Sequence, residues 1–105
     1  MAETKVHDIV AELQLTDTEA EALIAEYVRQ DGQHPGRHQA GVESSERWVQ
    51  IWRILPFLQV SGITRVAEEY GLPDSAMKAA VAYYRRHRRL FDAKIMIERE
   101  EQEAS

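Results

Sequence analysis

The stretch VAEEYGLPDSAMKAAVAYYRRHRRLFDAKI, residues 66–95, predicts two helices joined by a tight turn. The first helix covers about residues 63–70 and ends before a turn at residues 71–73, Gly-Leu-Pro. Asp74 or Ser75 is expected to cap the second helix, whose apolar stripe continues into the late 90s before an acidic tail. We therefore expect one long helix that carries the arginine-rich run RRHRR.

Three residues of this stretch have the spacing of a helix-turn-helix unit. In such units a small residue lets the second helix cross closely, a glycine four positions later takes a left-handed turn, and an apolar residue six positions further locks the helices together. Ala67, Gly71 and Met77 have this spacing, and Val66 and Val81 are expected to support them in the core. The sequence therefore predicts a helix-turn-helix that leads into a long Arg-rich helix.

The N-terminal third predicts two shorter helices. Apolar residues spaced by three and four indicate an amphipathic helix over residues 5–14. Thr16 and Glu19 have the spacing of a capping box at the start of a second helix, which we expect to end at Gly32. Residues 32–45 contain several glycines and a proline and are predicted to be a loop.

Residues 46–62, ERWVQIWRILPFLQVSG, predict a helix that is apolar nearly all round, kinked or divided at Pro56 and ended by Gly62. Such a helix must be covered on every side, which the rest of a 105-residue chain can barely do. We therefore expect either a very central helix or one that also forms a subunit interface. The residues assigned to a dimer or partner interface are Trp48, Ile51, Trp52 and Leu55.

Together these elements predict an all-α protein of about five helices, with a helix-turn-helix and a long C-terminal helix. We expect an acidic helical hairpin over residues 1–32 and a helix-turn-helix domain over residues 33–105. The two parts are expected to pack as one unit, because neither is large enough to bury a good core alone.

Composition restricts the function classes. The sequence has no cysteine, which excludes disulfides, thiolate metal sites and cysteine nucleophiles. No apolar run reaches the roughly 18 residues of a membrane span, and the acidic N-terminus does not resemble a signal peptide, so we expect a cytoplasmic protein without membrane contact. The net charge of −5 argues against an indiscriminate polyanion binder. Residues 32–90 nevertheless hold nine basic side chains against five acidic ones, which allows a local anion-facing patch.

The second helix of the motif is expected to present six residues to DNA. These residues are Ser75, Lys78, Ala82, Arg85, Arg86 and Arg89. The early positions are mostly alanine rather than the Arg, Asn or Gln that read base edges, and the arginines follow several turns later. DNA binding would therefore rest on phosphate contacts more than on base contacts. In the alternative interpretation, the arginines are a solvated face paired with the acidic N-terminal helices, and the alanine face packs against another helix.

No catalytic or metal site stands out, and no cofactor is expected. The sequence has no nucleophile–base set, glycine-rich phosphate loop or acid pair, so we do not expect an enzyme. His34 and His38 have i,i+4 spacing but straddle a Pro-Gly pair, so no helix aligns them on a metal. A haem sensor would use His87 in the long helix or another histidine.

Residues 66–95 resemble the C-terminal part of the bacterial and archaeal domain-of-unknown-function 433 family. The residues that follow the family pattern are Glu69, Tyr70, Leu72, Ala79, Ala80, Ala82, Tyr83, Tyr84, His87, Arg88, Asp92 and Ile95. The resemblance covers about residues 19–97. The family often carries a Gly-Thr-Arg-(Ile/Val) segment that is expected to form a strand before the central helix. This chain has GVESS at residues 41–45 instead, so a strand is not expected there.

The resemblance implies a helix-turn-helix protein, often encoded beside a PIN-like nuclease and commonly classed as the antitoxin of a toxin–antitoxin pair. We therefore expect an antitoxin-like protein or transcriptional regulator that binds DNA as a homodimer, with a PIN-like nuclease toxin as a further partner. Two alternatives stay open. One is a protein-interaction or dimerisation module that does not bind DNA, and the other is a small-molecule sensor, for example of haem.

Overall fold

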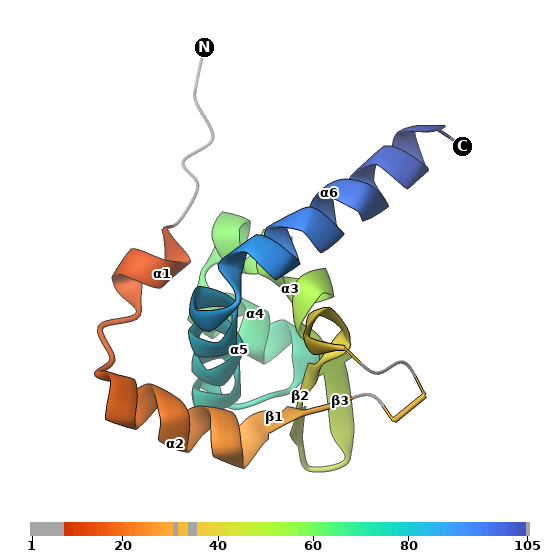
Figure 1. Ribbon diagram of the computed structural model, residues 1–105. Helices are drawn as coiled ribbons and strands as arrows, with labels where there is room; N and C mark the ends of the chain where they lie inside the picture. Colours follow the sequence, from red (N-terminus) through yellow and green to blue (C-terminus); the bar gives the residue numbers. More distant parts are fainter. Residues whose placement is uncertain (1–7, 31, 34–35, 105) are drawn as a thin grey trace.

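The computed structural model describes residues 8–30, 32–33 and 36–104 of the chain. Within these residues the protein is mostly helical, with six α-helices, one 3-10 helix and a small antiparallel sheet of three strands (Figure 1). The prediction of an all-α fold is therefore correct for most of the chain and wrong for the sheet. None of the helices in the described residues is long and apolar enough to cross a membrane.

The first two helices, α1 (Ile9–Glu12) and α2 (Asp17–Tyr27), follow each other around the outside of the molecule (Figure 1). The capping box predicted for α2 is confirmed. The Glu19 N–H donates to Thr16 Oγ1 at 3.2 Å, and the Thr16 N–H donates to Glu19 Oε1 at 3.2 Å. These reciprocal bonds satisfy N–H groups that have no partner inside the helix.

The N-terminal helices are shorter than predicted. Of the helix expected over residues 5–14, the part before residue 8 lies outside the described residues, and α1 is a single turn. The second helix ends at Tyr27 instead of Gly32, because the chain then enters the sheet as β1 (Val28–Arg29).

The sheet has the order β1-β2-β3, with β2 (Gly41–Ser44) in the middle and β3 (Arg47–Gln50) at one edge. All pairs are antiparallel, and Val42 lies opposite Val28 on one side and Val49 on the other. Val42 is fully buried, so the sheet contributes its middle strand to the hydrophobic core.

The β2–β3 hairpin turns at Ser45 and Glu46, whose φ angles are 50° and 71°. Positive φ at both turn residues is the geometry in which a two-residue loop matches the twist of the two strands. Sequence reasoning missed this hairpin because neither turn residue is the expected glycine or asparagine. In addition, Trp48 and Val49 extend the apolar run of the following helix, which hid the strand that contains them.

Helix α3 (Ile51–Ser61) follows β3 directly, and Pro56 lies inside it without dividing it. Only one side of α3 is buried, through Ile51, Ile54, Leu55 and Leu58. The exposed fractions of Phe57 and Val60 are 53% and 58%. Among the described residues the protein therefore covers α3 on one side only. Of the two alternatives, a helix at the centre of the chain is wrong, and a helix that also forms a subunit interface stays a prediction.

Helices α4 (Ile63–Tyr70) and α5 (Asp74–Arg86) are joined by the predicted turn. Gly71 has the left-handed conformation, with φ 67° and ψ 34°, which glycine adopts without the steric cost of a Cβ. Ala67 and Met77 are both buried, as their spacing in the sequence predicted. The turn at Gly71 and the buried positions of Ala67 and Met77 are thus confirmed.

The predicted cap of α5 is wrong. Pro73 is the cap residue and forms no side-chain capping bond, while Asp74 is already the first helical residue. Its carboxylate instead accepts a hydrogen bond from Thr64 Oγ1 of α4 at 3.0 Å. The side chain therefore links the two helices rather than capping one of them.

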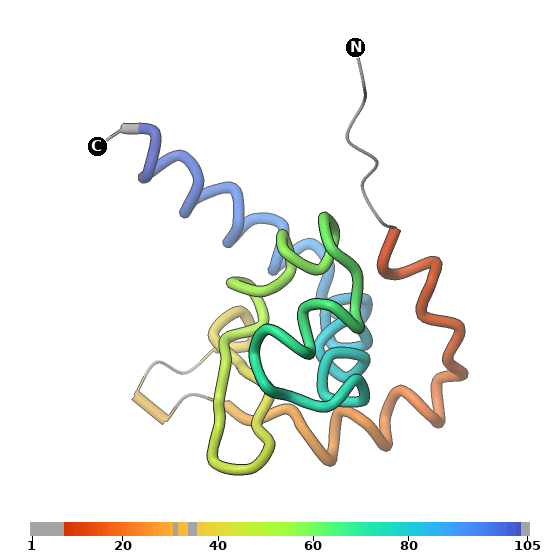
Figure 2. Tube along the Cα trace, turned by 180° about the vertical axis from the view of Figure 1, so that it is seen from behind, coloured from red at the N-terminus to blue at the C-terminus, as the bar shows by residue number. Residues whose placement is uncertain are grey.

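The predicted long C-terminal helix is in fact two helices, because the chain leaves helical geometry at His87 between α5 and α6 (Arg88–Ala104). The His87 N–H donates to the carbonyl oxygens of both Tyr83 and Tyr84, at 3.1 Å each. The break turns Phe91 back into the core, edge-on to the rings of Tyr83 and Tyr84. α6 then leaves the body at an angle to α5 (Figures 1 and 2).

Helix α5 is the centre of the fold, in contact with α1, α2, α4 and the sheet. Eight of its 13 residues are buried, and half of these are alanines, which allow neighbouring elements to approach closely. The residues are Ala76, Met77, Ala79, Ala80, Val81, Ala82, Tyr83 and Tyr84. The described part of the segment predicted as an N-terminal hairpin therefore shares one core with the rest of the chain.

Candidate nucleic-acid interface

The structure separates the predicted DNA-contact residues into two groups. In the first group, Ser75 is half-buried with its Oγ 3.0 Å from Tyr27 Oη of α2, Lys78 is exposed, and Ala82 is only 2% exposed. Helix α2 packs against α5 next to Ser75 and Ala82 and runs across it in Figure 1. Of these three residues, Lys78 alone is therefore exposed enough to reach DNA while α2 is in place.

The second group lies where α5 ends and α6 begins. Five arginines from three segments line one open cavity of about 480 Å³, together with His87 and Leu90. We call these five residues the arginine cluster: Arg37, Arg85, Arg86, Arg88 and Arg89. Arg37 comes from the 3-10 helix η1 (Arg37–Gln39), far away in the sequence, so no spacing rule could have found it.

Two members of the arginine cluster are paired with α2. Arg85 Nη2 lies 3.9 Å from Asp17 Oδ1, and Arg86 Nη2 lies 3.4 Å from Glu21 Oε1. The interpretation that this run pairs with the acidic N-terminal helices is thus confirmed for these two arginines. Both carboxylates are largely exposed to solvent, so the pairs are screened by salt and hold the helices only weakly.

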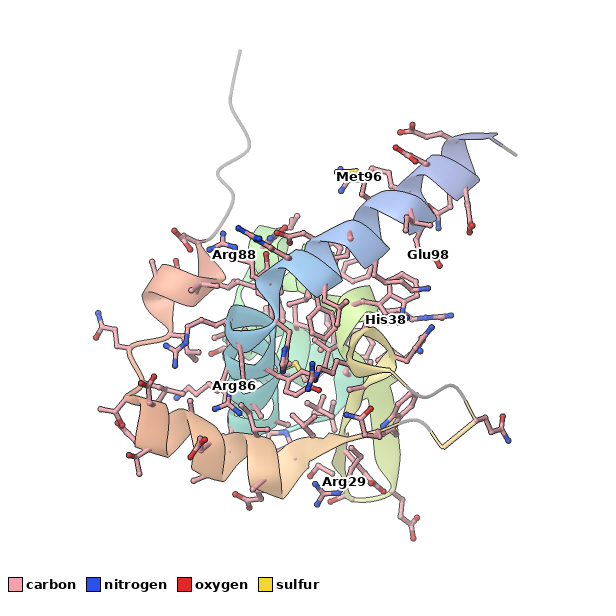
Figure 3. The ribbon with its side chains drawn as sticks, viewed as in Figure 1. Arg29, His38, Arg86, Arg88, Met96 and Glu98 are labelled. Carbon is pink, nitrogen blue, oxygen red and sulfur yellow. The ribbon has the colours of Figure 1, made fainter. Side chains whose placement is uncertain are left out.

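The other three arginines of the cluster are not paired with α2 and can contact a ligand. The Arg88 guanidinium lies over the Tyr84 ring, 5.8 Å from its centroid, on the side of the molecule that carries α1 and α2 (Figure 3). Arg37 and Arg89 are exposed, and neither forms an ion pair within the described part of the chain.

His87 lies inside the positive field of the arginine cluster. Its ring packs edge-on against Tyr83, with the ring centroids 4.6 Å apart. Burial lowers the pKa of His87 below its ordinary value near 6.5, and the charges of Arg37 and Arg86 lower it further. The surroundings therefore disfavour a further positive charge and favour an anion. Guanidinium groups bind phosphate oxygens through paired N–H donors, which is the chemistry that this surface offers.

The residues predicted for a dimer or partner interface do not form one surface. Ile51 and Leu55 are fully buried within the protomer, which leaves them no area for a partner. Trp52 is half-buried, with the Lys94 ammonium 5.0 Å from its ring centroid. Trp48 is exposed and lies on β3, whereas the other three residues lie on α3.

The other exposed large apolar side chains lie on α3 and α6. They are Phe57, Val60, Leu90, Met96 and Ile97. Met96 and Glu98 lie on opposite sides of α6 (Figure 3). The sequence did contain a signal for this surface, because Leu90 and Ile97 are seven residues apart and therefore share one side of a helix.

Within residues 8–30, 32–33 and 36–104, no three His, Asp or Glu side chains come together as metal ligands. His34 lies outside the described residues, and His38 is half-buried on η1. His87 packs edge-on against Tyr83.

The fold and the arginine cluster thus define a small, mostly helical protein with a cationic surface at the α5–α6 junction. No protein family, no curated protein and no solved structure matches the chain. The assignment of function therefore rests on the geometry and chemistry of its own residues.

Proposed function

We propose that the chain is a small helix-turn-helix protein, antitoxin-like or a transcriptional regulator, that binds the phosphate backbone of duplex DNA as a homodimer. The observation that carries this proposal is the convergence of five arginines from η1, α5 and α6 on one open surface. A ligand with several phosphates in a row is the partner that such a surface fits best.

Local geometry supports the class of protein. Ala67, Gly71 and Met77 occupy the three positions that set the crossing of α4 and α5, as in helix-turn-helix units. The antitoxin-like part of the proposal comes only from the resemblance of residues 19–97 to the domain-of-unknown-function 433 family, since no family model matches the chain. A PIN-like nuclease encoded beside this chain would strengthen that part of the proposal.

The proposed contact is with phosphates rather than bases. Base reading requires side chains that reach the groove floor, and α2 covers Ser75 and Ala82 on α5. The arginine cluster lies at the opposite end of α5, where guanidinium groups can follow a backbone. We therefore expect binding with little sequence preference.

The pairs of Arg85 with Asp17 and Arg86 with Glu21 allow this binding. Their carboxylates are largely exposed, so a phosphate can replace either one without uncovering a buried charge. The same carboxylates compete with DNA, which keeps the affinity moderate for a chain with a net charge of −5.

The test is the affinity for a short fluorescent duplex, measured by anisotropy over a series of salt concentrations. The logarithm of the association constant should fall linearly with the logarithm of salt, and each of Arg37→Gln and Arg88→Gln should reduce the slope by about one. Arg65→Gln is the matched control, because Arg65 is an exposed arginine on α4 outside the arginine cluster. Absence of binding at about 50 mM salt, or equal effects of all three substitutions, would contradict the proposal.

A second candidate is a protein-interaction module that does not bind DNA. It is favoured by the exposed apolar side chains of α3 and by the cavity of about 560 Å³ between α3 and α6, which Trp52, Phe57 and Ile95 help to line. The salt series separates the two candidates, since this module predicts no DNA binding at any salt concentration.

A further inference from the structure

Among the described residues, helix α6 is covered by the rest of the protein along one side only. Phe91 is buried and Ile95 is half-buried against the body, whereas the exposed fractions of Leu90, Met96 and Ile97 are 41%, 61% and 52%. The C-terminal half of α6 extends beyond the other elements in both views (Figures 1 and 2). A helix of this length is marginal in water unless an apolar side is packed.

The exposed apolar residues of α6 form a stripe. Leu90, Ala93 and Ile97 are spaced by three and four, and Met96 lies beside them. At 100° per residue this stripe points away from Phe91 and Ile95. Helix α6 therefore has two apolar sides, of which the chain covers one.

The charges of α6 oppose its own dipole. Arg88 and Arg89 begin the helix, where backbone N–H groups already concentrate positive charge, and Glu100 and Glu103 lie near its negative end. The helix has no acidic residue in its first turn and no basic residue in its last turn. Both ends thus lack the charges that normally stabilise a helix terminus.

We propose that α6 is the interface of a homodimer, in which the stripe of one copy packs antiparallel on the stripe of a second copy. An antiparallel pair places the arginines of one copy beside the acidic end of the other, and it also places opposite dipole ends together. A parallel pair would place like charges together. The same patch then serves both copies about a two-fold axis, as in most closed homodimers.

The distribution of charge along α6 indicates that its partner is a second copy of the same helix. Apolar centre, basic start and acidic end are all present on one helix, in the order that an inverted copy of the same helix requires. Arg89 and Glu100 are 11 residues apart, which places them within about 20° of each other around the helix, on the side of the stripe. In the antiparallel pair Arg89 therefore meets the partner's Glu100, with Ala93 near the partner's Met96. The proposal names the interface of the proposed homodimer and does not depend on DNA binding.

The first experiment is sedimentation of the purified full-length chain, without DNA, over a range of micromolar concentrations. We expect a dimer, and we expect Ile97→Asp to weaken it by roughly tenfold or more, because a charge would enter the centre of the packed stripe. Val60→Asp is the matched control, since Val60 is equally exposed but lies on α3. Circular dichroism checks that both variants keep their helices. A wild-type chain that stays monomeric at 100 micromolar, or equal weakening by both variants, would overturn the proposal.

The second experiment tests the antiparallel orientation through charge. Arg89→Glu and Glu100→Arg should each weaken the dimer, because each places like charges together across the interface. The double variant should regain most of the wild-type affinity, since it exchanges the two charges of every intermolecular pair. The two positions are three turns apart on one helix, so recovery cannot come from a contact within one chain. A double variant that is no better than the single ones rules out the antiparallel pair. Both experiments measure self-association in the absence of DNA. Their results therefore do not depend on whether the protein binds DNA.

Discussion

The Tyr84 hydroxyl donates a hydrogen bond of 2.6 Å to Asp92 Oδ1 and thereby connects α5 to α6 across the break at His87. Tyr84 is buried, and burial raises the pKa of its hydroxyl, as does the acceptor Asp92. The bond therefore joins a buried donor to a charged acceptor. It helps to hold the direction in which α6 leaves the core.

Removal of this bond should loosen the junction. We expect Tyr84→Phe to lower the free energy of unfolding by about 1–2 kcal/mol, as measured by urea denaturation, because the hydrogen bond has a charged acceptor. Tyr83→Phe is the control at the adjacent position, where the hydroxyl only accepts a longer bond of 3.3 Å from Gln30 Nε2. Its effect should be less than half as large, and the reverse order would contradict the role given to Tyr84.

The sheet should depend on Gly41. A Cβ at this position would lie 2.6 Å from the Val49 carbonyl oxygen and 2.4 Å from the Trp48 ring, closer than packed atoms can approach. We expect Gly41→Ala to lower the free energy of unfolding by about 1–3 kcal/mol. A Cβ on Gly32 would meet no atom within 4 Å, so Gly32→Ala should be nearly neutral in the same urea measurement. If both variants have the wild-type free energy of unfolding, β2 does not pack on β3 as closely as described.

Stability should change with pH because of His87. Burial and the charges of Arg37 and Arg86 lower its folded pKa below about 6.5, so the unfolded chain binds a proton more readily. The contribution of His87 to the free energy of unfolding is therefore complete above pH 6.5. It is lost as the pH falls from there through the pKa of His87 in the folded protein. We expect the free energy of unfolding to decrease from pH 7.5 to pH 5.5, and to decrease less in His87→Gln.

This decrease is separable from acid unfolding at carboxylates. The pKa of Glu19 is lowered from 4.5 by its bonds to Thr16, so its contribution is lost only as the pH falls below that value. A His87→Gln variant with the same slope as the wild type between pH 7.5 and pH 5.5 would show that His87 is not the titrating group.

Asp17 and Glu21 should compete with DNA for the arginine cluster. If the proposed function is correct, Asp17→Asn and Glu21→Gln should each raise the affinity for duplex DNA by a few-fold at low salt, because each frees an arginine. Glu26→Gln removes the same charge from an exposed position of α2 that forms no ion pair within the described residues, and it serves as the control. Equal gains in all three variants would mean that only the net charge matters.

Local sequence was sufficient wherever neighbouring residues decide the conformation. The Thr16–Glu19 capping box, the end of α4 at Gly71 and the buried positions of Ala67 and Met77 were all predictable, because each depends on groups within about ten residues. The three strands were not predictable, because their turn has no glycine and their apolar residues merge with those of α3.

The candidate site was predictable only in part. The run of arginines was visible in the sequence, but its division into paired and open members depends on where α2 lies. The addition of Arg37 depends on the packing of η1 against α6. Charge attraction acts through space, so residues that are distant in the chain decide which arginines stay available.

The sequence of residues 66–95 by itself predicts two helices and the turn between them, since caps, glycines and apolar spacing are local properties. Tertiary structure decided that α5 is the buried centre, that the chain breaks at His87, and that α6 points away from the body. The reason is the burial of Phe91 between the tyrosines of α5, which a continuous helix would have carried out of the core.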